Sequence, residues 1–90
     1  MISPGDIVIA TAGREKDNCF VVVGLQDNFA FISDGKSRKI DKPKKKKIKH
    51  LSSVIGHSEF VSAKLEKGES VTNREIKKEL KSYAEHNLRK

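Results

Sequence analysis

The chain has 90 residues, which suffices for one small domain with a modest hydrophobic core. A composition of 34% charged and 36% hydrophobic residues predicts a folded domain, and the single cysteine, Cys19, excludes an intramolecular disulfide framework. The N-terminus has neither the apolar stretch of a signal peptide nor the length of a membrane span, so we expect a soluble protein of the reducing cytoplasm that does not bind membranes.

The net charge of +7 is concentrated in one segment of the chain. Residues 1–35 have two basic and five acidic side chains, whereas residues 36–49 have nine basic side chains and one acidic side chain. Residues 36–49 therefore carry a charge of +8, and residues 59–90 add only +2. A block of one sign binds polyanions by releasing their condensed counterions, so nucleic acid is the first partner to consider.

Three short apolar runs begin the chain, at residues 5–12 (GDIVIATA), 19–25 (CFVVVGL) and 29–33 (FAFIS). They are rich in Val, Ile and Phe, and the segments between them contain Gly, Asp and Asn, which favour chain reversal. Because the runs are nearly continuously apolar, the pattern predicts three consecutive strands curled into a small β-barrel. A tight turn at 33–36 and a short fourth strand at 37–40 (SRKI) are expected next.

The lysine run, KPKKKKIKHL at residues 42–51, lies between apolar anchors at Ile40 and Ile48. Pro43 interrupts a regular hydrogen-bonding ladder, which favours an exposed loop or an edge strand. We therefore predict that residues 36–50 form a basic loop attached at both ends to the barrel.

Helical signals replace the strand pattern after residue 57. A short helix is expected from the N-cap Ser58 to the stop at Gly68, with one side formed by Phe60, Val61 and Leu65. Thr72 and Glu75 fit a capping box before a second helix, whose apolar stripe consists of Ile76, Leu80, Tyr83, Ala84 and Leu88. We thus predict a mainly β fold, with a barrel over 1–57 and a helical C-terminal extension over 58–90. The second helix is marginal alone and needs either the barrel or a partner to pack against.

The stretch GDIVIATAGREKDNCFVVVGL (5–25) resembles the KOW motif, a strand-loop-strand element of ribosomal proteins and transcription elongation factors. Together with DGKSRKIDKPKKKKIKHL (34–51) and KLEKGESVTNREIKKEL (64–80), it is similar to small KOW-domain RNA-binding proteins of Gram-positive bacteria, which are related to a large-subunit ribosomal protein group. The resemblance implies an SH3-like barrel that contacts structured RNA, ribosomal RNA or the large ribosomal subunit, through its loops and basic edge. One departure is that Asp17 or Asn18 stands where the KOW turn usually has glycine, although both residue types tolerate the left-handed conformation.

The candidate RNA-binding residues are the basic side chains of the first hairpin loop and of the basic segment. They are Arg14, Lys16, Lys36, Arg38, Lys39, Lys42, Lys44, Lys45, Lys46, Lys47, Lys49 and His50. Arg38 ranks first outside the lysine run, because a guanidinium group binds phosphate bidentately or stacks on an unpaired base. Arg14 and Lys16 could equally well be solvated side chains of a hairpin loop or contact RNA, and the resemblance favours RNA contact.

The phenylalanines lie in the apolar runs and not among the lysines. We therefore expect Phe20, Phe29 and Phe31 in the core, and only Phe29 or Phe31 is retained as a candidate for base stacking. The lack of aromatic residues in 36–50 favours recognition of RNA backbone and shape over recognition of splayed bases.

Catalytic and metal-binding signatures are missing from the sequence. Cys19, His50, His57 and His86 are too scattered for a zinc site, and the chain has no Walker-type loop or nucleophile elbow. We expect a binding module without cofactor, not an enzyme. Two alternatives stay open: a protein interaction module that uses the C-terminal helix, and a transcription-associated KOW domain that binds DNA. A solvated charge block and a nuclear localisation signal are further interpretations of the lysine run.

Overall fold

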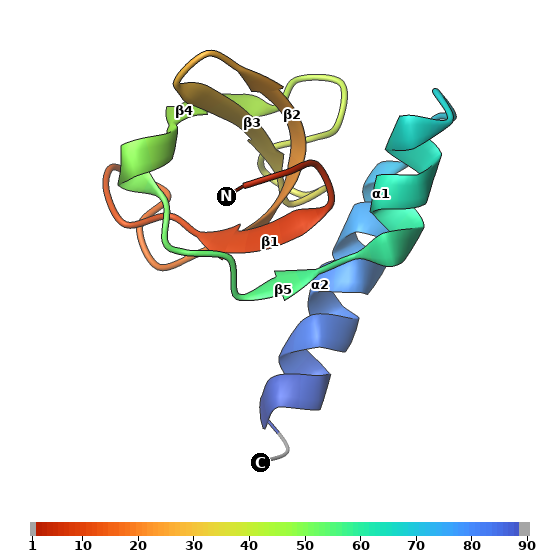
Figure 1. Cartoon of the computed structure of the whole chain (residues 1–90). Coiled ribbons are helices and arrows are strands. Elements are labelled where there is room, and N and C mark those ends of the chain that lie inside the picture. The colour runs from red at the N-terminus through yellow and green to blue at the C-terminus, as the bar shows by residue number, and fades with distance from the viewer. Residues whose placement is uncertain (1, 89–90) are drawn as a thin grey trace.

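The computed structural model describes the backbone of residues 2–88 and the side chains of residues 2–85. Its five strands are β1 (Asp6–Ile9), β2 (Cys19–Gln26), β3 (Phe29–Ser33), β4 (Lys44–Lys47) and β5 (Gly56–His57). They form one antiparallel sheet in the order β4-β3-β2-β1-β5. Figure 1 shows that the sheet is strongly curved, with the 3-10 helix η1 (Ile48–His50) between β4 and β5 and the helices α1 (Glu59–Glu66) and α2 (Asn73–Leu88) outside the curve.

The predicted mainly β fold with a helical C-terminal extension is confirmed, and the first three strands lie where the apolar runs predict them. Both hairpin loops use an aspartate with positive φ, Asp17 at 73° and Asp27 at 53°. Asp17 and Asp27 therefore take the left-handed conformation, which Asp tolerates better than most residues.

The predicted fourth strand at 37–40 is wrong, because this segment is held in a turn by side chains that precede it. The Asp34 carboxylate accepts hydrogen bonds from the backbone N–H groups of Lys36 and Arg38, and the Ser33 hydroxyl donates to the Arg38 carbonyl. Local side-chain bonds of this kind compete with a sheet ladder. The fourth strand is instead β4, formed by four lysines of the run for which Pro43 predicted an exposed loop or an edge strand, and β4 lies at the edge of the sheet.

The helix boundaries follow the predicted capping residues. Ser58 accepts a hydrogen bond from the Val61 N–H, and α1 ends before Gly68, whose φ is 73°. Thr72 and Glu75 exchange two hydrogen bonds of 2.9 and 3.1 Å, as a capping box does. Phe60, expected on the packing side of α1, is 47% exposed, so that part of the prediction is wrong.

Two hydrophobic clusters lie on the two faces of the curved sheet. The first cluster consists of Val8, Ala10, Phe20, Val22, Ala30, Ile32 and Leu51. The second cluster lies between the sheet and the helices and consists of Ile7, Val21, Val61, Val71 and Ile76. Because neighbouring residues of β1 and β2 enter different clusters, both faces of these strands are covered, which explains their continuously apolar sequence.

The apolar stripe of α2 packs on the sheet. The sequence left open whether this helix packs against the barrel or against a partner. Ile76 is fully buried, Leu80 and Tyr83 pack against the second cluster, and the Tyr83 hydroxyl donates to the Ile55 carbonyl at 2.8 Å. Ala84 is exposed, and the Leu88 side chain lies outside the described residues. Within residues 2–88, neither helix has the length and apolar character that crossing a bilayer requires.

Candidate nucleic-acid interface

The lysines of β4 differ in solvent exposure according to the face of the strand on which they lie. Lys45 and Lys47 are exposed, whereas Lys44 is half-buried and Lys46 is only 8% exposed. Successive residues of a strand point to opposite faces, so Lys45 and Lys47 share the outer face and Lys46 turns inward. Half of the strand is therefore available to a ligand through its ammonium groups.

Glu15 is the carboxylate partner of Lys46 and Arg38. One of its carboxylate oxygens lies 3.1 Å from Lys46 Nζ and the other accepts a hydrogen bond from the Arg38 guanidinium, while Lys46 also donates to the Ala12 carbonyl at 2.8 Å. The hydrogen bond from Arg38, opposed by burial and reinforced by Lys46, lowers the pKa of Glu15 from 4.5 to about 2. Lys46 and Arg38, two of the predicted RNA-binding residues, are thus engaged in an internal ion-pair cluster.

The Glu15 cluster joins three segments that are distant in sequence. Glu15 lies in the loop between β1 and β2, and its partners Arg38 and Lys46 lie 23 and 31 residues further along the chain. Sequence reasoning missed Glu15, because no local signal marks an acid whose partners are this remote. Through Glu15, the loop that carries Arg14 and Lys16 is attached to β4 and to the turn at 34–38.

The turn at 34–38 is fixed independently by Asp34. Burial acts to raise the pKa of Asp34, but hydrogen bonds from the backbone N–H groups of Arg38 and Lys36 and from Ser37 outweigh it, so the pKa lies below its ordinary value. Lys36 and Lys39 are exposed in and beside this turn. Their positions are therefore set by the backbone and not by contacts of their own side chains.

Two phenylalanines stand next to the exposed lysines of β4. Phe29 pairs with Lys47 and Phe31 with Lys45 across the β3-β4 ladder. Both rings are half-buried, whereas the intervening Ala30 is fully buried in the first cluster. The expectation of a core position is confirmed for Phe20 but wrong for Phe29 and Phe31, which belong to the outer face of β3.

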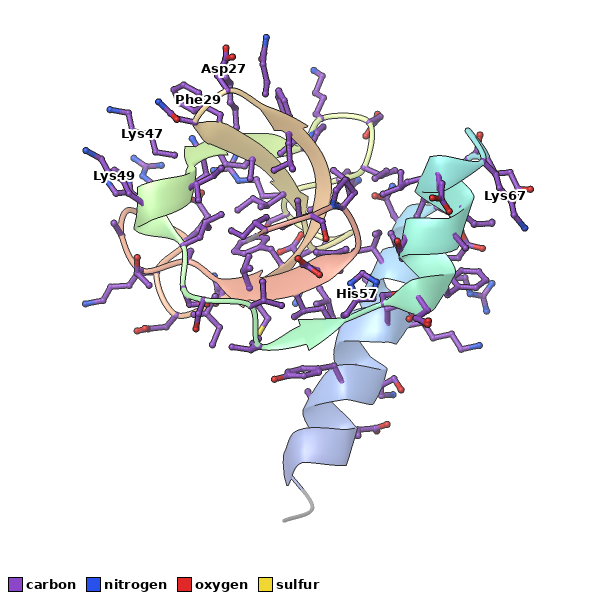
Figure 2. All side chains as sticks on the ribbon, viewed as in Figure 1. Asp27, Phe29, Lys47, Lys49, His57 and Lys67 are labelled. Atoms are coloured by element: carbon purple, nitrogen blue, oxygen red, sulfur yellow. The ribbon has the colours of Figure 1, made fainter. Side chains whose placement is uncertain are left out.

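A cation-π contact links the two strands on this face. Lys45 Nζ lies 4.6 Å from the centre of the Phe29 ring. At an exposed site such a contact contributes about 0.5–1 kcal/mol. We call the surface formed by Phe29, Phe31, Lys45, Lys47 and Lys49 the Phe-Lys face. Figure 2 shows Phe29, Lys47 and Lys49 on the side of the molecule away from the helices.

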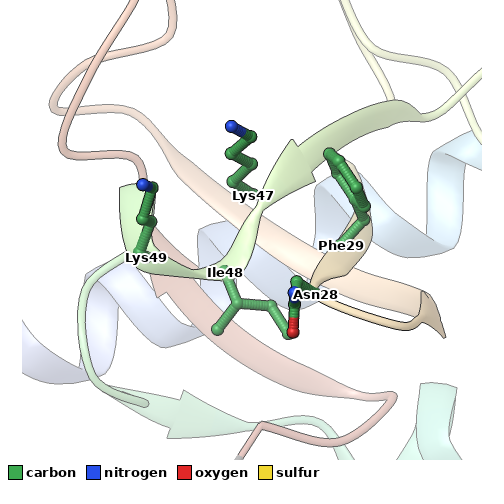
Figure 3. Close-up of a pocket in the computed structure, with 5 residues that line it drawn as sticks. All are labelled: Asn28, Phe29, Lys47, Ile48 and Lys49. Carbon is green, nitrogen blue, oxygen red and sulfur yellow. The ribbon is translucent and has the colours of Figure 1, made fainter.

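A hollow of about 510 Å³ lies at one end of the Phe-Lys face, lined by Asn28, Phe29, Lys47, Ile48 and Lys49. In Figure 3, Phe29 and Lys49 flank Lys47, and Asn28 and Ile48 lie next to each other. The Ile48 N–H donates to the Asn28 carbonyl at 2.9 Å, which fixes η1 to the β2-β3 turn. The hollow therefore combines an aromatic ring, two exposed ammonium groups and an amide.

The other predicted RNA-binding residues with exposed or half-buried side chains lie outside the Phe-Lys face. Arg14, Lys16, Lys36, Lys39 and Lys42 are exposed, and Lys44 and His50 are half-buried. The His50 carbonyl accepts a hydrogen bond of 2.9 Å from the Thr11 N–H, so the loop with Arg14 starts beside η1. The basic residues thus come from neighbouring segments, and the Phe-Lys face is where they meet aromatic side chains.

The cysteine and the remaining histidines lie outside the Phe-Lys face. Within the part of the chain that the structure describes, no three His, Cys, Asp or Glu side chains are grouped to hold a metal ion. Cys19 is half-buried, and burial raises the pKa of its thiol. His57 Nδ1 lies 2.6 Å from the buried Asp6 carboxylate, and the His86 side chain lies outside the described residues. Comparison of the chain with protein-family models and with curated proteins finds no match.

Proposed function

We propose that this chain is an RNA-binding module of the SH3-like, KOW type that docks on structured RNA through the Phe-Lys face. The antiparallel strand order, the strong curvature of the sheet and the resemblance of residues 5–25 to the KOW motif support the fold type. Ribosomal RNA in the large subunit, in the cytoplasm, is the partner that the resemblance suggests.

The observation that carries the proposal is the asymmetry of the charges around β4. Glu15 pairs with the buried Lys46 and with the half-buried Arg38 and offsets one of their two positive charges, whereas Lys45, Lys47 and Lys49 have exposed side chains on one surface. Such a surface offers several ammonium groups at once to the closely spaced phosphates of a nucleic acid. The helices lie away from it, so their exposed lysines do not add to it (Figure 2).

The test is the salt dependence of binding to a structured RNA. If about five phosphates are neutralised, log K falls with log salt with a slope of about −3.5 to −4.5. Replacement of Lys45, Lys47 and Lys49 by Gln should reduce the magnitude of that slope by about 2 to 3. The matched control replaces Lys67, Lys78 and Lys81 by Gln, which removes the same charge from exposed positions of the helical part.

Equal slopes for both triple variants would contradict docking through the Phe-Lys face, and a flat salt dependence of the unmodified protein would contradict the whole proposal. Competition with duplex DNA and with polyglutamate separates RNA binding from the two alternative functions. For the ribosomal partner, the protein in a lysate should sediment with the large subunit at low salt and leave it at high salt.

A further inference from the structure

The hollow beside β4 is lined by apolar side chains as well as by lysines. A phosphate-binding surface requires cations, but here Phe29 and Ile48 line a concave site together with Lys47 and Lys49. The volume of about 510 Å³ lies within the range of about 300–1,000 Å³ that is usual for small organic groups. The apolar part of this site therefore calls for an apolar or aromatic part of the ligand.

Phe29 takes part in two features of this surface, the hollow and a cation-π contact. Lys45 lies over the ring, but Lys45 is not among the residues that line the hollow. The half-buried Phe29 is thus shared by the cation-π contact and by the hollow. A planar group bound in the hollow would meet Phe29 there.

The ligand must be both flat and negatively charged. Aromatic rings bind nucleobases by stacking, and every base has a face suited to it. Lys47 and Lys49 lie next to Phe29, where they can bind the phosphates on either side of a stacked base. The Asn28 side chain adds a hydrogen-bond donor and acceptor for a base edge.

Resting on the proposed RNA binding, we infer that this hollow is a subsite for one unpaired base, stacked on Phe29 and bracketed by phosphates on Lys47 and Lys49. The expected ligand is thus a loop or bulge of a structured RNA and not a continuous duplex, whose bases are stacked inside the helix. The sequence pointed to recognition of backbone and shape, because Phe29 lies outside residues 36–50. In the folded chain β3 pairs with β4, so Phe29 lies next to the lysines although it is distant from them in sequence.

The experiment compares an RNA hairpin that has an unpaired loop with a blunt duplex of the same stem. The unmodified protein should bind the hairpin more tightly. Phe29→Leu should weaken hairpin binding by roughly 5- to 150-fold, the range for loss of one stacked base, and leave duplex binding and its salt slope unchanged. The matched control is Phe60→Leu on α1, because Phe60 also has a lysine ammonium group over its ring, with Lys64 Nζ at 5.2 Å, and lies at an exposed position.

A second readout does not depend on the Leu variant. The chain has no tryptophan, so Phe29→Trp introduces a single tryptophan at the subsite, which can be excited selectively beside Tyr83. Its emission should be quenched by the hairpin but not by the duplex or by polyglutamate, and Phe60→Trp should respond to none of them.

Equal hairpin affinity of Phe29→Leu and the unmodified protein, or equal loss of affinity for both RNAs, would overturn the subsite while leaving RNA binding intact. Quenching by polyglutamate would assign the hollow to an acidic protein, and absence of salt-dependent binding to either RNA would overturn the proposed function as well.

Discussion

Glu15 determines which basic side chains this protein presents to its surroundings. Its carboxylate holds Lys46 and Arg38 together, and the side chains of Glu15 and Lys46 are each only 9% exposed. A buried ammonium group that loses its counter-ion is costly, because its remaining partner here is the Ala12 carbonyl. At the residue scale, Glu15 is therefore a stability determinant of the loop, the turn and β4 together.

Glu15→Gln should lower the free energy of unfolding at neutral pH by about 1.5–3 kcal/mol, the usual contribution of hydrogen bonds to charged groups. The folded protein lowers the pKa of Glu15 from 4.5 to about 2, so its ionised form contributes stability above pH 4.5 that is lost as the pH falls towards 2. Urea denaturation across this range should show the difference between the unmodified protein and Glu15→Gln shrinking with acidification. A difference that does not change with pH would contradict the ion-pair role, and Glu69→Gln at an exposed position is the control.

Among the elements, β4 shows where prediction from sequence succeeds and where it fails. The first three strands and both helix caps are predictable, because Val, Ile and Phe runs and Ser or Thr capping residues act locally. Four consecutive lysines have low strand propensity, and their strand depends on pairing with β3 and on the remote Glu15. In the site, the exposed lysines were predictable from composition, whereas Phe29 or Phe31 could be retained only as a candidate, since a nearly continuous apolar run hides which side chains face outward.

The contact between α2 and the turn at 34–38 gives a prediction at the scale of elements. Gly35 has φ 72°, and a Cβ atom there would lie 2.4 Å from the Asn73 carbonyl oxygen at the start of α2. Gly68 has a nearly identical φ of 73°, but a Cβ atom there would meet nothing within 4 Å. Gly68→Ala should therefore cost only the left-handed strain of about 1–2 kcal/mol, and Gly35→Ala should cost clearly more.

Thermal or urea unfolding of the two glycine variants measures this difference directly. Because both substitutions add the same methyl group at the same φ, the excess cost of Gly35→Ala reports the close approach of α2 to the turn. The Asn73 side chain also accepts a hydrogen bond from the Ile40 N–H at 2.7 Å, which supports the same contact. Equal destabilisation by the two substitutions would show that this contact adds nothing to stability.

In the molecule as a whole, sheet and helices share the second hydrophobic cluster, in which Ile7 and Val21 of the sheet meet Val61, Val71 and Ile76. Truncation of the chain at Gly68 would test whether a protein partner binds through the C-terminal helix. However, it removes two of these buried side chains, Val71 and Ile76. Loss of binding by such a truncated chain would therefore report unfolding and not the loss of a partner surface. Point substitutions on the surface are the informative tests of function.

Ile76→Ala should lower the free energy of unfolding by about 2–5 kcal/mol, since Ile76 is completely buried. The sheet and the helices should unfold in one transition, and RNA affinity under native conditions should change little, because the Phe-Lys face lies on the other side of the molecule (Figure 2). Lys78→Ala, at an exposed position of the same helix, serves as the control. Two separate unfolding transitions, with only the helical one affected, would show that the helices are an independent unit.

The position of β4 at the edge of the sheet has one more consequence, which concerns contacts between copies of the chain. In the described part of the chain, β3 is the neighbour of β4 on one side only. An open edge of this kind can recruit a strand from another molecule and start aggregation. Lysine at all four positions of β4 would set like charges opposite one another in such a pairing, which is unfavourable. The charges proposed to attract RNA should thus also oppose pairing of this edge with a second copy, and acetylation of these lysines would weaken both effects together.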